Sequence, residues 1–262
     1  MSLQSFSLNN LFGVKGKVVI VTGGGTGIGR AIATALTVNG AKETAKELNT
    51  AAQEAQSGGE CIPVEGNVAT KEGVVEVYEK VSKLTDKNDP VKLEKMLWSI
   101  EDVDFANMTV IHVSGPYLLA VKCIPLLQKS NDACVTNITS LASHFLNRAC
   151  CEFAYAQSKA AETHLTQLMA AGLSPFNIRV NSIAPGIFKS QLTTGTTERD
   201  APLWSVQQNQ LKNIPKGHRE GHWEEVAGAA LMLISPAGGY TNGANIIIDG
   251  GWRLFTSAKD VQ

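Results

Sequence analysis

The chain has 262 residues, of which 44% are hydrophobic, and its 23 basic and 24 acidic side chains give a formal net charge of -1. A chain of this length can bury a sizeable core, so we expect one α/β domain that spans residues 1–262. The balanced charge provides no general attraction to polyanions, which excludes nucleic acid and anionic membranes as expected partners.

The cysteines and the N-terminus bear on where the protein works. The five cysteines show neither the even count of a disulfide framework nor paired CxxC metal ligands, so we expect reduced thiols and no metal site. Residues 1–17 lack a basic stretch followed by a long apolar run, and we expect no window with the roughly 18 apolar residues of a membrane span. A soluble, cytoplasmic protein is predicted.

The first elements begin a parallel sheet. The run VVIVTGGG at residues 18–25 is β-branched and apolar and ends in glycines, which is typical of a buried strand that enters a tight turn. Small and apolar residues at helical spacing predict a helix over residues 28–38, with Gly40 just beyond its end. The chain then runs from Ala41 directly into a polar, alanine-rich helix at residues 43–56, so the strand that a doubly wound sheet needs here is missing.

The same interruption occurs a second time. Residues 61–64 supply a short strand and residues 71–84 an amphipathic helix, but no β-branched run follows near Asn88. A polar segment that opens at Asp89 leads instead into a long helix that ends at about Leu127.

Beyond this helix the alternation of strands and helices is regular. Three further strands and two helices are expected, at residues 133–139, 177–186 and 245–251 and at residues 155–171 and 223–234. This order predicts a Rossmann-like, doubly wound parallel sheet that lacks its second and fourth strands. Residues 188–221 contain few apolar runs, which fits a lid over a substrate and equally a plain surface loop.

Residues 22–29, TGGGTGIG, form a glycine-rich turn between the first strand and the first helix. Residues without side chains let backbone amides approach a pyrophosphate at the positive end of a helix dipole. Glycine clusters also occur in ordinary turns, so the motif alone is moderately specific. Its spacing, TGxxxGxG, differs from the GxGxxG of other dinucleotide-binding turns.

The motif YAQSK puts the phenol of Tyr155 and the ammonium of Lys159 on one face of the predicted helix. The cation can stabilise a phenolate, which can then exchange a proton with an alcohol. By itself a YxxxK pair is more often a solvated helix pair, but this one follows a strand that ends in NITS. Ser140 at that strand end can face the phenol and bond the reacting oxygen. Ser143 is the alternative for this task, and a turn or cap is the alternative role of Ser140.

The motifs TGGGTGIG, NITS, YAQSK, NSIAPG and IIIDGG follow one another across nearly the whole chain. In this order the sequence resembles the short-chain dehydrogenase/reductase family, and its fungal members in particular. The resemblance implies that Tyr155 is the acid/base, that Lys159 holds the nicotinamide ribose and tunes Tyr155, and that Ser140 orients the substrate. It also implies a cofactor, NAD or NADP, bound by Thr22, Gly23, Gly27, Ile28, Gly29, Asn67, Tyr155, Lys159, Pro185, Gly186, Ile187 and Ser190.

Two departures from the family concern the missing strands. The second strand, which precedes the residue that selects NAD or NADP, has no counterpart between Lys42 and Glu43, so the choice of cofactor is not predicted. The fourth strand is missing around Asn88. In the family's strand order 3-2-1-4-5-6-7, both absences would leave backbone groups of the first strand unpaired. An incomplete gene model is our preferred explanation, ahead of a splice form or a degenerate protein.

Two further departures are single residues. His112 stands three residues before Gly115, where the family has a catalytic asparagine. An imidazole can pass protons through water to Lys159, although a buried structural histidine is the more common role. Asn67 stands where the family usually has an aspartate beside the adenine, and its amide can keep that contact.

The resemblance implies an NAD(P)-dependent oxidoreductase that transfers hydride between the nicotinamide and a ketone or secondary alcohol. A pseudoenzyme that retains the fold for binding or oligomerisation is the alternative, because two strands are missing. The helices around residues 105–127 and 155–171 resemble those that family members pair in dimers and tetramers. The expected partners are therefore a small carbonyl or alcohol substrate and further copies of the chain, in a homodimer or homotetramer.

Overall fold

The computed structural model describes residues 11–15, 19, 21, 26–39, 100–144, 153–198 and 200–255. Several predicted features lie outside these residues: Thr22, Gly23, Asn67, the elements expected at 43–56, 61–64 and 71–84, and both points at which a strand is missing.

The described strands form one parallel sheet in the order β1-β2-β3. They are β1 (Ala133–Ile138), β2 (Ile178–Pro185) and β3 (Asn245–Ile248). Every residue of β2 is buried, as expected of a central strand that is covered on both faces. The three later strands predicted from the sequence are thus confirmed.

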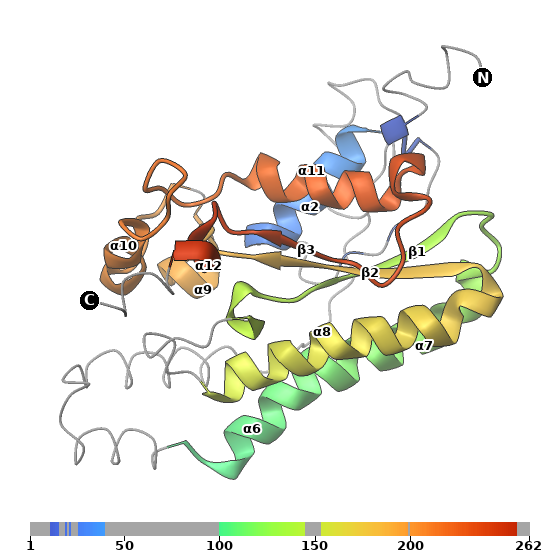
Figure 1. Cartoon of the computed structure of the whole chain (residues 1–262), viewed down its shortest axis with the longest axis horizontal. Helices are drawn as coiled ribbons and strands as arrows, with labels where there is room; N and C mark the ends of the chain where they lie inside the picture. Colours follow the sequence, from blue (N-terminus) through green and yellow to red (C-terminus); the bar gives the residue numbers. More distant parts are fainter. Residues whose placement is uncertain are drawn as a thin grey trace.

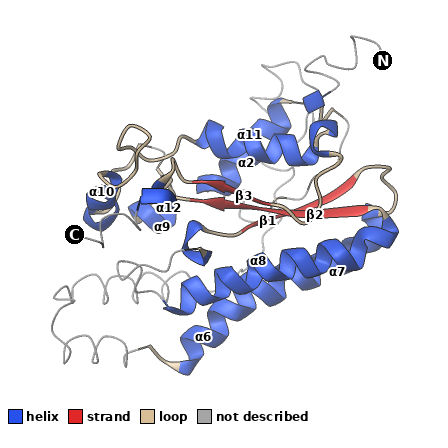
Figure 2. Ribbon diagram, viewed as in Figure 1, coloured by secondary structure: helices blue, strands red, loops and turns tan. Residues whose placement is uncertain are grey.

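Helices cover both faces of this sheet (Figures 1 and 2). On one face lie α2 (Gly27–Val38) and α11 (Trp223–Ile234). The other face carries α8 (Phe153–Leu173) and a long helical run. That run consists of α6 (Asp102–Thr109), the π-helix η2 (Val110–Ser114) and α7 (Gly115–Leu127). Because α8 connects β1 to β2 across one face and α11 connects β2 to β3 across the other, the sheet is doubly wound, as predicted.

The core between α2, α11 and the sheet is closely packed. Leu36, Ile183, Val226 and Leu233 are each fully buried in one apolar cluster. Burial of a side chain of this size stabilises a fold by about 1.5–3 kcal/mol. This cluster holds α2 against the later strands, which places residues 26–29, the described end of the glycine-rich turn, at the edge of the sheet where those strands end.

Short elements gather mainly at the carboxyl end of the sheet (Figure 1). The predicted lid at residues 188–221 contains α9 and α10, and a parallel bridge between Phe188 and Gly221 pairs its two ends. The short helices are η3 (Leu141–Ser143), η4 (Ser174–Phe176), α9 (Gln191–Thr194), α10 (Ser205–Leu211), η5 (Pro236–Gly238) and α12 (Trp252–Phe255).

The expectation that no window is apolar enough for a membrane span is wrong by length and composition. The run Asp102–Leu127 contains an 18-residue window with a mean hydropathy of 1.6, of which only 6% is buried. The expectation failed because small and weakly polar residues interrupt the apolar ones, whereas charged residues in the run are few. One such helix is weak evidence for a membrane, since an apolar face is equally suited to a protein partner.

Candidate active site

Predicted site residues from two strands lie at one edge of the sheet, because the carboxyl ends of parallel strands meet there. Ser140 follows β1, Pro185 ends β2 and Gly186 comes directly after it. The Gly186 N–H donates to the Ile248 carbonyl at 2.8 Å, and a Cβ at position 186 would lie 2.9 Å from Cα of Asp249. Glycine is therefore required where β2 and β3 end side by side.

The glycine-rich turn reaches the same edge. Gly27 has a φ of +51°, which favours glycine, and a Cβ there would lie 2.8 Å from Cβ of Ser190. Two residues predicted to hold the same cofactor are thus in direct contact although they are far apart in the sequence. Ile28 and Gly29 follow in the first turn of α2, where the N-cap Thr26 makes no side-chain capping bond and no acidic residue is present.

Ser140 caps the short helix η3, which packs against α8. Its Oγ accepts a hydrogen bond from the Ala142 N–H at 3.1 Å, and the Ser143 hydroxyl donates to the Ser140 carbonyl at 2.6 Å. A hydroxyl has one proton to donate. Ser143 uses its proton in this turn, whereas Ser140 serves only as an acceptor in it, which favours Ser140 over Ser143 as a donor to a substrate oxygen.

The side chain of Lys159 reaches from α8 to the end of β1, two residues before Ser140. Its Nζ donates to the carbonyl of Ile138 and to Oε2 of Glu162, each at 2.8 Å. Both ends of this ion pair are buried, with side chains 10% and 4% exposed. Lys159 is thereby held where β1 ends, on the same helix as the half-buried Tyr155.

His112 lies in the π-helix η2 and faces the YAQSK segment of α8. Its Nδ1 is 2.8 Å from Oγ of Ser158, and that hydroxyl donates its proton to the Tyr155 carbonyl at 2.8 Å. Nδ1 must therefore be the protonated nitrogen of the imidazole, and Nε2 is left as an acceptor. The imidazole also contacts the Tyr155 ring edge to face, with centroids 5.4 Å apart.

Burial, and secondarily the charge of Lys159, lower the pKa of His112 to about 3. The imidazole is neutral throughout the physiological range as a result. This favours the structural role that the sequence analysis weighed over a role in which His112 repeatedly gains and loses a proton.

Two of these contacts were missed by sequence reasoning. Ser158 lies inside YAQSK and Glu162 three residues beyond Lys159, a spacing at which side chains on a helix meet. The signal for Glu162 was present in the sequence KAAE, where a carboxylate follows a lysine on the face that carries Tyr155. Asn67, Thr22 and Gly23 lie outside the described residues, so the structure places none of them.

Ile187 belongs to the core at the carboxyl end of the sheet. It is 7% exposed, packs in a cluster with Leu141 and Leu203, and its carbonyl accepts from the Gly221 N–H at 2.8 Å. Its side chain therefore packs next to the site and connects η3 with the segment that precedes α10.

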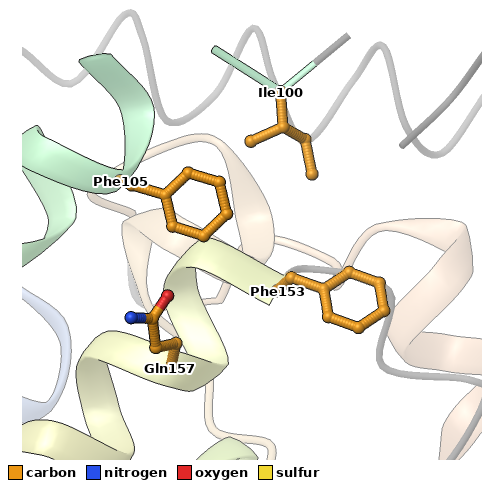
Figure 3. A pocket seen from close by; sticks show the side chains of 4 residues that line it. All are labelled: Ile100, Phe105, Phe153 and Gln157. Atoms are coloured by element: carbon orange, nitrogen blue, oxygen red, sulfur yellow. The ribbon is translucent and has the colours of Figure 1, made fainter. Parts of the chain in front are cut away.

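A separate hollow of about 520 Å³ lies near the start of α8 (Figure 3). Its described lining consists of Ile100, Phe105, Phe153 and Gln157, none of which is a predicted site residue. Phe153 and Gln157 are four residues apart and share one face of α8, whereas Tyr155 projects from another. This hollow is mainly apolar and is distinct from the face of α8 that bears Tyr155 and Lys159.

Comparison with known proteins decides the family. A family model described as enoyl-(acyl carrier protein) reductase matches residues 23–253. The short-chain dehydrogenase/reductase PhomF of Diaporthe leptostromiformis is 32% identical, over 95% of this chain and 96% of that protein. The chain belongs to the short-chain dehydrogenase/reductase family. This confirms the family proposed from the motifs, including its fungal resemblance.

Other members of the family agree with this assignment. Glucose 1-dehydrogenase 2 of Bacillus subtilis is 29% identical over 92% of this chain and 96% of its own. Among solved structures, the NADP complex of Pseudomonas aeruginosa RhlG has a TM-score of 0.69 at 26% identity, covering 93% of this chain and 98% of its own. A 7α-hydroxysteroid dehydrogenase in complex with NADH and 7-oxo glycochenodeoxycholic acid has a TM-score of 0.68 at 26% identity, covering 92% and 96%.

The match to PhomF also bears on the missing strands. It extends over 282 residues, more than the 262 that this chain contains, so the chain lacks residues that this relative has. The interruptions inferred from the sequence are consistent with such gaps.

Proposed function

We propose that this short-chain dehydrogenase/reductase is an NAD(P)-dependent oxidoreductase that interconverts a ketone and a secondary alcohol. The observation that carries the proposal is the placement of Lys159. This residue lies on the helix that bears Tyr155, and its Nζ donates to the carbonyl of Ile138, two residues before Ser140. We infer that an acid/base, a cation and a hydroxyl donor meet where parallel strands end, next to the described end of the glycine-rich turn.

A nicotinamide dinucleotide fits the described residues of this edge. The first amides of α2 have no side-chain cap, and that turn holds no acidic residue that would repel a pyrophosphate. Gly27, Gly186 and Ser190 offer backbone or a small side chain where the cofactor would approach closely. When bound, the nicotinamide supplies or accepts the hydride.

The remaining chemistry belongs to the side chains of this chain. In the reducing direction Tyr155 donates its phenolic proton to the substrate oxygen as the carbonyl carbon is reduced, and Ser140 donates a hydrogen bond to the same oxygen. The Lys159 ammonium stabilises the phenolate that remains. In the oxidising direction the phenolate removes the alcohol proton, so protons balance in both directions.

The names of the relatives support a small alcohol or carbonyl as substrate, because they include a glucose 1-dehydrogenase, an NAD-dependent glycerol dehydrogenase and a hydroxysteroid dehydrogenase with a 7-oxo ligand. We place the cover of the substrate in residues 188–221. This segment begins beside Gly186 and carries α9 and α10, and the buried residues Leu203 and Ile214 anchor it to the core.

We also propose that the chain works as a soluble, cytoplasmic homodimer or homotetramer. The support is an apolar surface on η2, α7 and α8. Its large exposed side chains are Val110, Tyr117, Leu118, Leu126 and Leu168. An exposed surface of this kind favours association with a second copy.

The test of the activity uses Tyr155→Phe and the fully exposed Tyr240→Phe as its matched control. In purified protein with NADH or NADPH and a panel of small ketones and alcohols, turnover should fall at least about a hundredfold in the first variant and remain in the second, because only the first removes the proton donor. Retained turnover in Tyr155→Phe would refute the assignment.

Thermal unfolding with each cofactor separates an enzyme from a pseudoenzyme. A cofactor present at 100 times its Kd stabilises the folded state by about 2.7 kcal/mol, so a rise in melting temperature is expected with NADH or NADPH. No rise with either cofactor, together with no turnover, would favour the pseudoenzyme.

A further inference from the structure

The ammonium of Lys159 has a buried carboxylate as its partner. Nζ of Lys159 lies 2.8 Å from Oε2 of Glu162, one helical turn away, and both side chains are almost wholly excluded from solvent. Burial raises the pKa of Glu162, and the charge and hydrogen bond of Lys159 oppose that shift. Since a buried charge is tolerated when it is paired and hydrogen-bonded, the two residues form one electrostatic unit.

The geometry of this unit fixes where the ammonium lies. An ammonium has three N–H donors, and Lys159 directs one to Glu162 and another to the Ile138 carbonyl at the end of β1. The carboxylate thus pins Nζ between α8 and β1, and a third donor is left for the site. The position of the Lys159 charge is determined by Glu162 as much as by the helix that carries both.

We propose that Glu162 is a positioning residue of the catalytic site, which holds the Lys159 ammonium at the end of β1 and offsets part of its charge. The proposal rests on the proposed function in taking Tyr155 and Lys159 as the reacting pair. A full positive charge beside the phenol would favour its phenolate strongly, and a carboxylate bonded to that charge weakens the effect. Removal of the Glu162 charge should therefore let Lys159 favour the phenolate more strongly.

Few other ionisable groups act on this pair. From η2, His112 faces it, and its imidazole stays neutral because its pKa is lowered to about 3. Of the other described elements that pack on α8, β2 carries Arg179, which pairs with Asp132, and α6 carries acidic residues in its first turn. For the described residues, Lys159 is the charge that shifts the pKa of Glu162.

Glu162→Gln tests the proposal because it removes the charge and keeps the shape of the side chain. The measurement is the tyrosinate absorbance of each protein as pH is raised, with the curve of the matching Tyr155→Phe protein subtracted to isolate Tyr155. We expect Glu162→Gln to move the midpoint down by about one pH unit. Glu224→Gln, which removes the same charge from an exposed position of α11, should leave it unchanged.

A merely structural carboxylate gives a different result. It would lower the free energy of unfolding in Glu162→Gln and leave the midpoint of Tyr155 where it was, and that outcome overturns the proposal. If Glu162→Gln fails to fold, Glu162→Asp replaces it. The shorter acid keeps the charge but lengthens the contact with Nζ, so a downward shift of a few tenths of a pH unit is expected, and an unmoved midpoint again overturns the proposal.

Enzyme activity provides a second test that is independent of the absorbance measurement. With any alcohol that the panel identifies as a substrate, the low-pH limb of kcat/KM for oxidation should move down in Glu162→Gln by the same amount as the tyrosinate midpoint. The absorbance experiment needs neither cofactor nor substrate. Failure of the proposed function, seen as retained turnover in Tyr155→Phe, is therefore distinguishable from failure of the role of Glu162.

Discussion

His112 stands at a position where the family has a different residue, and the chemistry of that position changes with it. The resemblance places a catalytic asparagine there, and the imidazole instead donates from Nδ1 to Ser158 and packs its ring against Tyr155. Both contacts suit a neutral ring that supports the start of α8. The contact with the Tyr155 ring is one of packing, so we expect His112 to orient Tyr155.

The lowered pKa of His112 makes stability depend on pH. The folded-state pKa of about 3 lies below the ordinary 6.5, so unfolded chains bind the proton more readily. The resulting stability is complete above about pH 6.5 and is lost as the pH falls toward 3, with a slope of up to about 1.4 kcal/mol per pH unit. His112→Asn should remove this contribution to the pH dependence of the free energy of unfolding.

Urea unfolding at pH 7, 5 and 4 measures the effect as the change in the free energy of unfolding. The exposed His164→Gln on the same helix as Tyr155 is the control and should follow the original protein. An equal slope in His112→Asn and the original protein would show that the imidazole is not the group responsible.

At the scale of elements, Arg179 ties strand, helix and loop together. Its guanidinium bonds Asp132 before β1, the Leu233 carbonyl at the end of α11 and the Gly238 carbonyl in η5. It is 8% exposed, so these bonds are made largely away from water. They join elements on one face of the sheet to the amino ends of two strands, opposite the edge that bears the site.

Arg179→Met should therefore destabilise the protein strongly. It removes the guanidinium from the Leu233 and Gly238 carbonyls and from the Asp132 carboxylate, and breaking a largely buried pair in this way costs about 3 kcal/mol. Arg219→Met removes an exposed pair with Glu225 and should cost about 1 kcal/mol or less. Chemical denaturation gives both values, and similar losses for the two variants would contradict the role assigned to Arg179.

How far the sequence predicts these elements depends on how local the signal is. The short strand pattern of β2, with its turn residues at the end, and the apolar helix pattern of α11 are local, and both elements appear at the predicted residues. The π-helix η2 is not predictable in this way, because its extra residue is fixed by packing between α6, α7 and α8. The order of motifs also predicts that Ser140, Tyr155 and Lys159 share one edge, and this stays a prediction, whereas the contact of Lys159 with Glu162 is seen only in the structure.

For the whole molecule, the exposed apolar face of α6, α7 and α8 is the feature that requires an explanation. The same helical run meets the length and composition of a membrane span, yet it packs on α8 along one side. A second copy that covers Leu118 and its neighbours would bury this face and leave the packing against α8 intact.

Leu118→Glu tests this assembly. A carboxylate in an apolar interface should weaken association by about 2 kcal/mol or more and shift the protein toward the monomer, as measured by light scattering during size exclusion. Tyr240→Glu, at a fully exposed position that belongs to none of these helices, should keep the mass of two or four chains. A monomeric original protein that sediments with lipid vesicles would contradict the proposal.

The paired ends of the segment at residues 188–221 have an evolutionary consequence. The ring of Phe188 presses on Gly221 so closely that no side chain is tolerated there, and the strand-like bridge fastens the two ends to each other. Because lengthening a fastened loop adds little entropic cost, roughly 0.6 kcal/mol for each doubling, insertions and exchanges within this segment leave the sheet and the reacting groups undisturbed. Under the proposed function, selection can thus redesign what this protein recognises while inheriting its chemistry unchanged.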